Sequence, residues 1–294
     1  MLRPRKKNKL NPPRPLHIDG TALVITFKGE KARCAQLVPM LLRHGLQDVQ
    51  CIDPSFEPGS ASNYARADEL GLTLPRDTGE DFHWKKPIED VYRELDFKWP
   101  RHNSPIRMTA SKVRSISQYF VDITDGDVGA AVSHAIALEK ARLNELPTLI
   151  VESDAHLKDN FTEKLNSVMS NLKDTEWDIL LLAFKELAPV RPQAKKTYPQ
   201  VEGACVAGFC WNTTAYVVTP KGARKILQSM QKSPFIGIFD DIIPTMQWGS
   251  PIKIMNDAFG PNQDREALIT YRTVNTLVVE DAIHGRTSST NLIK

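Results

Sequence analysis

The chain has 294 residues, of which 41% are hydrophobic and 25% are charged, and its net charge is +3. This composition is typical of a soluble globular protein with a sizeable core and excludes a fibrous or largely disordered chain. Much of the positive charge lies in a proline-rich stretch at residues 1–18, which indicates a flexible tail rather than a nucleic-acid-binding body. The sequence has no apolar run long enough for a transmembrane segment, and no apolar stretch typical of a secretory signal follows the basic N-terminus.

The four cysteines fit no zinc-binding pattern. Cys205 and Cys210 are five residues apart, which is wider than the usual spacing in a zinc pair. We predict that these two residues, together with Cys34 and Cys51, are plain thiols. Because the sequence shows no signal peptide or transmembrane segment, and because unpaired thiols favour a reducing compartment, we expect a cytoplasmic location.

The first elements of the chain predict a βαβ unit. The apolar, β-branched run Thr21–Phe27 is typical of a buried strand. Ala32–His44 has apolar residues at helical spacing, although Pro39 should bend the helix, and Gly45 is a common helix-ending residue. Val49–Ile52 reads as a second short strand. A strand, a helix and a strand of these lengths indicate an α/β fold with a parallel sheet.

A basic loop follows the first predicted strand. Ligands of open α/β sheets bind beyond the carboxyl ends of the strands. Lys28 and Arg33 are therefore candidates for contact with a nucleotide, although a solvated loop is the commoner role of such residues.

Residues 54–120 are rich in proline and glycine and predict only short helices. Trp84 and Trp99 lie there in polar surroundings, and they could stack on sugars or belong to a small satellite core. We interpret this region as a variable excursion from the sheet that shapes an acceptor pocket.

A capped helix begins near residue 124. Thr124 and Asp127 are spaced as in a capping box. The helix that follows carries Ser133 and His134. A lone histidine in a helix is more often a packing residue than a ligand, and the alternative is that Ser133 and His134 contact the nucleotide donor.

Two acids follow the next predicted strand, Thr148–Val151. Glu152 and Asp154 are two residues apart, and residues at that spacing on a strand point to the same face. Carboxylate oxygens are preferred ligands of Mg²⁺ and Mn²⁺. The pattern predicts a metal site, with a solvated strand end as the alternative.

The second half of the chain continues the alternation of strands and helices. The expected elements are a helix at Asn160–Leu172, a strand at Trp177–Phe184, a mobile loop at residues 185–201, a strand at Thr213–Val218, a helix from Pro220 capped by Thr219, and a last short strand at Ile252–Met255.

Two adjacent acids, Asp240 and Asp241, interrupt an apolar run. Acids in such a setting are costly unless they are paired, exposed or functional. Both are candidate catalytic residues. The C-terminal segment, residues 250–294, contains scattered polar groups that include His284.

These motifs together resemble glycosyltransferase family 25. The run G-D-V-G-A-A-V-S-H at 126–134 is similar to the start of a family helix, and T-L-I-V-E-S-D-A at 148–155 is similar to the family's strand ending in Glu-Asp-Asp. Segments 215–227 and 240–246 are similar to two later family motifs in the same order. The sequence departs from the pattern at Ser153, where the family has an acid.

The resemblance implies a Rossmann-like α/β domain of the GT-A type at residues 19–294, with a mostly parallel central sheet flanked by helices. It implies an inverting glycosyltransferase. The enzyme would move galactose or a related hexose or pentose from a nucleotide sugar, UDP-linked, to a hydroxyl of a glycan or protein.

The resemblance also assigns roles. Mn²⁺ or Mg²⁺ on Asp154, with help from Glu152 and with His284 as a distant ligand, would neutralise the departing diphosphate. Asp240 is the first choice for the general base and Asp241 the second.

Two alternatives remain. The loss of the middle acid at Ser153 keeps open a catalytically degenerate module that binds a glycan or a nucleotide sugar without turnover. A glycoside hydrolase is a weaker alternative, because Glu152 and Asp154 are too close to flank a glycosidic bond.

Overall fold

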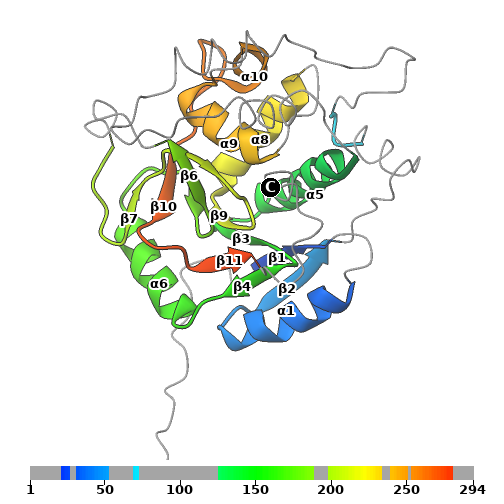
Figure 1. The fold of residues 1–294 in the computed structure, drawn as a ribbon, viewed down its shortest axis with the longest axis vertical. Helices are drawn as coiled ribbons and strands as arrows, with labels where there is room; N and C mark the ends of the chain where they lie inside the picture. The colour runs from blue at the N-terminus through cyan, green and yellow to red at the C-terminus, as the bar shows by residue number, and fades with distance from the viewer. Residues whose placement is uncertain are drawn as a thin grey trace, which may run out of the picture.

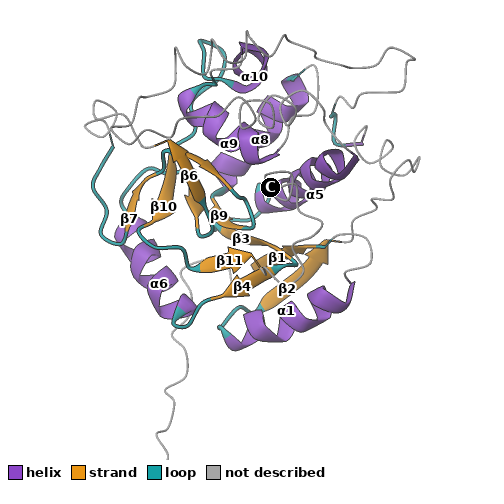
Figure 2. Ribbon diagram, viewed as in Figure 1, coloured by secondary structure: helices purple, strands orange, loops and turns teal. Residues whose placement is uncertain are grey.

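The structure is a computed structural model. It describes residues 21–26, 31–52, 69–72, 125–188, 198–233, 239–250 and 253–280. Within these ranges the chain forms a large central sheet with helices on both faces (Figures 1 and 2).

The central sheet is mixed. Its order is β2 (Asp48–Ile52), β1 (Thr21–Ile25), β3 (Thr148–Glu152), β9 (Ala215–Val218), β5 (Ile179–Leu181), β10 (Thr270–Thr273) and β7 (Ala204–Val206). β1 pairs in parallel with β2 and β3, and β5 pairs in parallel with β10. β9 and β7 pair antiparallel with their neighbours, so all the other strands share one direction. The predicted α/β class is confirmed.

Alternate strand residues pack against different helix layers. Leu23 and Ile25 of β1 belong to the core under α5 (Asp125–Ala141), α8 (Pro220–Lys232), α9 (Phe239–Trp248) and α10 (Lys253–Phe259). Ala22 and Val24 belong to the core under α1 (Lys31–Arg43) and α6 (Phe161–Leu172). Because side chains alternate along a strand, the sheet buries both faces in a three-layer arrangement (Figure 1).

Two short antiparallel pairs lie outside the main sheet. β4 (Ala155–Leu157) pairs with β11 (Val278–Glu280), and β6 (Lys185–Ala188) pairs with β8 (Phe209–Trp211). β4 follows β3 after a two-residue turn, and β8 precedes β9. Both pairs therefore flank the strands that carry the predicted site.

Local signals at the helix ends are confirmed. Gly45 has a φ of 91° just after α1, a conformation that glycine adopts without steric cost. At the start of α8, the Thr219 hydroxyl accepts a hydrogen bond from the Gly222 backbone N at 2.9 Å, with Pro220 in the first turn.

Two sequence predictions are corrected, and one strand of the main sheet was not predicted. The strand expected at Ile252–Met255 is wrong, because α10 occupies this region and Arg265 donates to the carbonyl oxygens of Asp257 and Ala258 near the end of the helix. The loop expected at residues 185–201 begins instead with β6, whose polar residues form an antiparallel ladder through backbone bonds. β10 was not predicted, although it lies between β5 and β7 in the main sheet.

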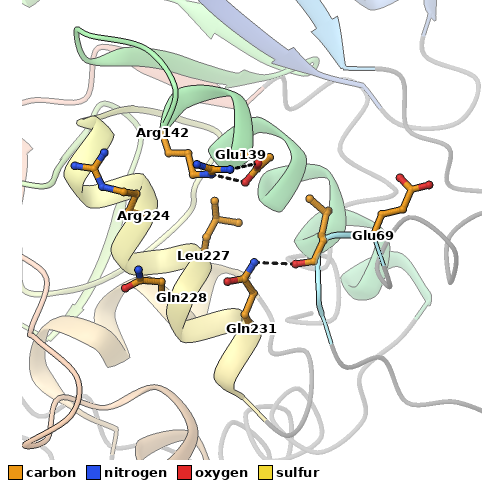
Figure 3. Close-up of a pocket in the computed structure, with 8 residues that line it drawn as sticks. Glu69, Glu139, Arg142, Arg224, Leu227, Gln228 and Gln231 are labelled. Carbon is orange, nitrogen blue, oxygen red and sulfur yellow. Dashed lines mark hydrogen bonds and ion pairs between the residues drawn. The ribbon is translucent and has the colours of Figure 1, made fainter.

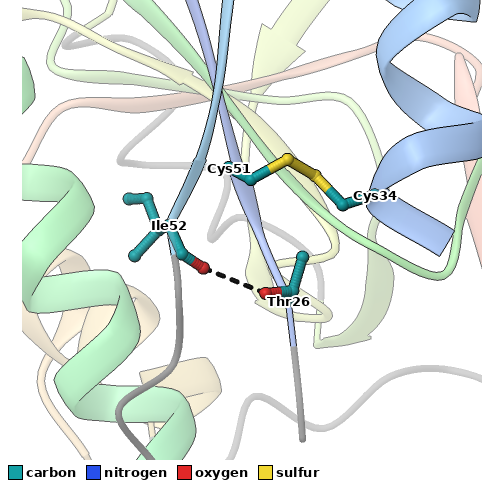
Figure 4. Close-up of a disulfide and its surroundings, with 4 residues drawn as sticks. All are labelled: Thr26, Cys34, Cys51 and Ile52. Atoms are coloured by element: carbon teal, nitrogen blue, oxygen red, sulfur yellow. Dashed lines mark hydrogen bonds between the residues drawn. A yellow bond between two sulfur atoms is a disulfide. The ribbon is translucent and has the colours of Figure 1, made fainter. Parts of the chain in front are cut away.

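The cysteine prediction is also corrected. Cys34 of α1 and Cys51 of β2 form a disulfide with their Cα atoms 6.5 Å apart (Figure 4). The Thr26 hydroxyl beside it donates to the Ile52 carbonyl oxygen at 3.0 Å, which joins the ends of β1 and β2. Disulfides persist in oxidising compartments, so the part of the argument for a cytoplasmic location that rests on the cysteines no longer holds. Cys205 and Cys210 lie outside this disulfide and are thiols, as predicted.

Other predictions lie outside the described residues. These are the tail at 1–18, most of the excursion at 54–120, and the candidate residues Lys28 and His284. Of the described helices, none has the length and apolar character needed to cross a membrane.

Candidate functional site

The candidate site begins at the carboxyl ends of β1, β2 and β3. Ile25 pairs in register with Ile52 on one side and with Glu152 on the other, so all three strands end at one edge of the sheet. Glu152 is the last residue of β3, and its side chain is 17% exposed. Arg33 lies in the first turn of α1, the helix that follows β1, and is partly exposed. Ligand sites of open α/β sheets form at such an edge.

Asp154, the second predicted metal ligand, does not lie on the strand that carries Glu152. β3 ends at Glu152, and Ser153 and Asp154 form the turn into β4. The expectation that Glu152 and Asp154 share a strand face is therefore wrong, because strand alternation does not extend through a turn. Ser153 is buried, and its backbone N donates to the Ile25 carbonyl oxygen at 2.8 Å. Asp154 remains partly exposed at the sheet edge.

His134 of α5 is buried beneath Glu152. Its side chain is 1% exposed, and its Nε2 lies 3.1 Å from Glu152 Oε1. Its Nδ1 lies 3.0 Å from the Tyr216 hydroxyl of β9. The ring also stacks on Phe239, with centroids 4.0 Å apart and an interplanar angle of 3°. Both ring nitrogens are thus engaged within the protein.

The surroundings of His134 and Tyr216 determine which atoms of these two side chains carry protons. Burial lowers the pKa of His134 to about 3, with the Asp240 carboxylate acting in the opposite direction, so the ring is neutral near pH 7. An ionised carboxylate can only accept, so we assign the ring proton to Nε2, and the Tyr216 hydroxyl then donates to Nδ1. Burial, followed by the charges of Glu152 and Asp240, raises the pKa of Tyr216 well above 10, which keeps its hydroxyl protonated.

Asp240 lies in the first turn of α9, directly after Phe239. Its Oδ1 accepts hydrogen bonds from the Thr213 backbone N at 2.9 Å and from the Thr213 hydroxyl at 2.5 Å. Its Oδ2 has no hydrogen-bond partner in the described part of the chain, and the side chain is partly exposed. A carboxylate held through one oxygen can take up a proton on the other.

A compact turn holds Thr213 in this position. Asn212 has a φ of 80°, a left-handed conformation that asparagine tolerates better than most residues. Its side-chain oxygen accepts from the Thr214 backbone N at 3.0 Å. The Thr214 carbonyl oxygen in turn accepts from the Glu152 backbone N at 2.7 Å. Asp240 and Glu152 are therefore both tied to the two residues just before β9.

Asp241 has a different environment from its neighbour. It is fully buried, and its Oδ1 accepts a hydrogen bond from Trp211 Nε1 of β8 at 2.7 Å. This bond connects the first turn of α9 to the short β6–β8 pair. The carboxylate lies in the core and is shielded from solvent.

The described residues include no group of three or more His, Cys, Asp and Glu side chains that could hold a metal ion by themselves. Glu152 and Asp154 still supply oxygen ligands from the end of β3 and the adjoining turn. Mg²⁺ is often bound by one or two carboxylates together with substrate phosphates. The residues present fit a cation that shares its ligands with a bound diphosphate.

Two features lie outside this arrangement of acids, which are Ser133 and a cavity. Ser133, a predicted contact of the nucleotide donor, is buried beside His134 in α5 and has almost no exposed surface. A cavity of about 550 Å³ lies elsewhere, between α5 and α8 (Figure 3). Glu139, Arg142, Arg224 and Gln231 are among the residues that line it, and it includes none of the predicted site residues.

Four residues of the site escaped sequence reasoning: Trp211, Thr213, Tyr216 and Phe239. Tyr216 offered one signal, because a tyrosine inside an apolar strand usually has a partner for its hydroxyl. The others depend on strand register and helix placement, which the local sequence does not reveal.

Comparison with known proteins gives a consistent result. Residues 100–243 match the model of glycosyltransferase family 25 (LPS biosynthesis protein). A Mus musculus protein named inactive glycosyltransferase 25 family member 3 is 32% identical over 127 residues, which cover 42% of this chain and 21% of that protein. Procollagen galactosyltransferase 2 of Homo sapiens is 25% identical over 133 residues, which cover 44% of this chain and 21% of that protein. Procollagen galactosyltransferase 1-A of Xenopus laevis is 23% identical over 185 residues, which cover 60% of this chain and 27% of that protein. The matched region thus spans about a fifth to a quarter of those relatives.

Proposed function

We propose that this chain, which belongs to glycosyltransferase family 25 through residues 100–243 as its motifs indicated, transfers a sugar from a nucleotide sugar to a hydroxyl of a glycan or protein. The observation that carries the proposal is that the Glu152 and Asp240 carboxylates both act on the buried His134, the first through a contact of 3.1 Å and the second through its charge. One acid comes from the end of a sheet strand and the other from a helix N-terminus. Two carboxylates in one place serve the two needs of such a transfer, which are stabilisation of the leaving group and activation of the acceptor.

The donor would bind at the carboxyl edge of β1, β2 and β3, as in a GT-A-type fold. Arg33 in the first turn of α1 would contact the diphosphate or the nucleotide, since a guanidinium pairs with phosphate in a bidentate manner. The names of the relatives favour galactose as the transferred sugar, and the family resemblance favours UDP as the carrier. Lys28 and His284 remain predictions outside the described residues.

A divalent cation, Mn²⁺ or Mg²⁺, would neutralise the charge that develops on the departing diphosphate. Asp154 would be its main ligand from this chain, and Glu152 would assist from the end of β3. Both side chains are partly exposed at the edge where the donor would bind. Their carboxylate oxygens match the hard ligands that these cations prefer.

Asp240 would act as the general base. An inverting transfer needs a base on the face of the sugar opposite the leaving group, close to the acceptor hydroxyl. Thr213 holds Asp240 Oδ1, and Oδ2 is left to accept the proton of the acceptor. Asp241 is fully buried and bonded to Trp211, so we assign it to the anchoring of α9 and leave the base role to Asp240 alone.

A second function, a module that binds a nucleotide sugar or glycan without turnover, is favoured by one observation. Ser153 replaces the middle acid of the family pattern and is buried, with its backbone bonded to β1. The site therefore lacks one carboxylate of the family motif. Relatives named inactive are consistent with this alternative.

A thermal-shift screen of nucleotide sugars with and without Mn²⁺ tests the proposal, because selective binding raises the unfolding temperature. We expect one UDP-sugar to stabilise the protein, more strongly with Mn²⁺. Asp154→Ala should remove the Mn²⁺-dependent part of the shift. An unchanged shift in that variant would exclude the metal assignment, and the absence of any nucleotide-sugar binding would exclude the donor site.

A further inference from the structure

His134 lies between the two acids that the proposed function uses. Its ring donates through Nε2 to Glu152 at 3.1 Å and accepts through Nδ1 from Tyr216 at 3.0 Å. One face of the ring stacks on Phe239, the residue directly before Asp240. At 1% exposure the ring cannot reach a bound ligand. A buried ring with both nitrogens bonded can still determine where its neighbours point.

Strand register explains why Tyr216 reaches this histidine. Tyr216 of β9 pairs directly with Ile150 of β3, which lies two residues before Glu152. Cross-strand partners and residues two apart on a strand share a face of the sheet, so Tyr216 and Glu152 both face α5. His134 of α5 fills the space between their polar groups. His134 of α5 thus links two neighbouring strands through hydrogen bonds, from Tyr216 of β9 to Glu152 of β3.

We propose that His134 and Tyr216 are positioning residues, which hold the Glu152 carboxylate in the orientation that a divalent cation at this edge requires. The inference rests on the proposed function. A ligating carboxylate is usually oriented by a hydrogen bond to one of its oxygens, and the loss of such a partner typically weakens metal binding by about 10–100-fold. His134 supplies this bond to Oε1, and Tyr216 fixes the ring that supplies it.

The two positions can be tested with matched variants. Tyr216→Phe removes only the hydroxyl that donates to His134. Tyr271→Phe is its control, because Tyr271 is equally buried in the same sheet and its hydroxyl donates to the Pro199 carbonyl oxygen at 3.0 Å, away from the site. His134→Gln keeps an N–H group for Glu152, whereas His134→Leu has similar bulk and no donor.

The experiment measures free Mn²⁺ by electron paramagnetic resonance during titration of the full chain in the presence of UDP, with a blank that contains UDP but no protein and with the unfolding temperature of each variant as a check on folding. We expect His134→Leu to raise the Mn²⁺ dissociation constant about 10–100-fold and His134→Gln to restore part of the affinity. Tyr216→Phe should raise the constant up to about tenfold, and Tyr271→Phe should leave it unchanged. In the His134→Leu background, Tyr216→Phe should have no further effect on Mn²⁺ binding, because the effect passes through the ring.

Equal effects of Tyr216→Phe and Tyr271→Phe on Mn²⁺ binding would overturn this inference while leaving the proposed function intact. A wild-type protein that binds no Mn²⁺ even with UDP present would overturn the proposed metal role and this inference with it. The two failures are therefore distinguishable in one titration series.

Discussion

Replacing Asp240 with Asn tests the proposed base and leaves its surroundings nearly unchanged. Asp240 Oδ1 accepts two hydrogen bonds from Thr213, at 2.9 Å from the backbone N and at 2.5 Å from the hydroxyl. The side-chain oxygen of Asn can accept both, so the side chain keeps its position. The amide nitrogen that replaces Oδ2 cannot take up the proton of an acceptor hydroxyl.

The magnitude follows from these contacts. A general base contributes about 10²–10⁴-fold to the rate, so turnover should fall by that factor, or by about 3–5 kcal/mol of activation free energy. Stability should change less, because the loss of one negative charge from the first turn of α9 costs about 0.3–1 kcal/mol. The dissociation constant of the donor should stay close to that of the wild type.

The assay is UDP release at saturating donor and acceptor, together with calorimetric donor binding. Asp174→Asn, at an exposed acid in the turn after α6, is the matched control and should behave as wild type. Thr213→Val keeps the base but removes one of its two hydrogen bonds, so its loss of turnover should be smaller. Turnover retained by Asp240→Asn would refute the assignment of the base.

Three more predictions concern stability and pH. Replacing Cys34 and Cys51 together with Ala should lower stability by about 3 kcal/mol, because the bond closes a loop with a sequence separation of 17. Thermal unfolding without reductant should show a fall of about 6 °C, and no change would mean that the bond does not form in solution. Burial lowers the pKa of His134 to about 3, so between that value and 6.5 the unfolded chain binds a proton that the folded chain does not. The free energy of unfolding of the wild type should therefore fall by about 2 kcal/mol from pH 7 to pH 5. Urea unfolding of His134→Gln should show a smaller fall over the same range. An identical pH dependence of the wild type and the variant would contradict this explanation. Lys225→Ala should cost about 3–5 kcal/mol in urea unfolding, since it leaves the fully buried Asp178 without the ammonium 2.7 Å away, and a loss below about 1 kcal/mol would be inconsistent with that pair.

The parts of the fold that follow from local chemistry could be predicted from the sequence. β1 and β3 are continuous apolar, β-branched runs because both faces of the sheet are covered by helices. The start of α8 follows from Thr219 and Pro220, which act within one turn. β10 could not be predicted because its four residues, T-Y-R-T, carry no apolar pattern. Its place depends on pairing with β5 and β7, which are distant in sequence.

The acids of the candidate site could be predicted from the sequence, but their arrangement in space could not. Glu152 and Asp240 could be selected because acids next to apolar runs stand out, and because the motifs around them resemble a family pattern. Their convergence could not be predicted, since it depends on the turn at Asn212 and on the register between β9 and β3. The relation of Glu152 to Asp154 was predicted incorrectly, because β3 ends at Glu152 and Asp154 lies in the turn into β4.

The most direct test of the proposed function is sugar transfer by the wild-type protein. The chain would be incubated with a panel of UDP-sugars, Mn²⁺ and hydroxyl-bearing glycan or peptide acceptors, and the product would be analysed by mass spectrometry and by NMR of the anomeric centre. We predict transfer from one donor with inversion at the anomeric carbon, and loss of transfer on chelation of the metal. Binding of a nucleotide sugar without transfer or donor hydrolysis across the whole panel would contradict the proposed enzyme and favour the binding module.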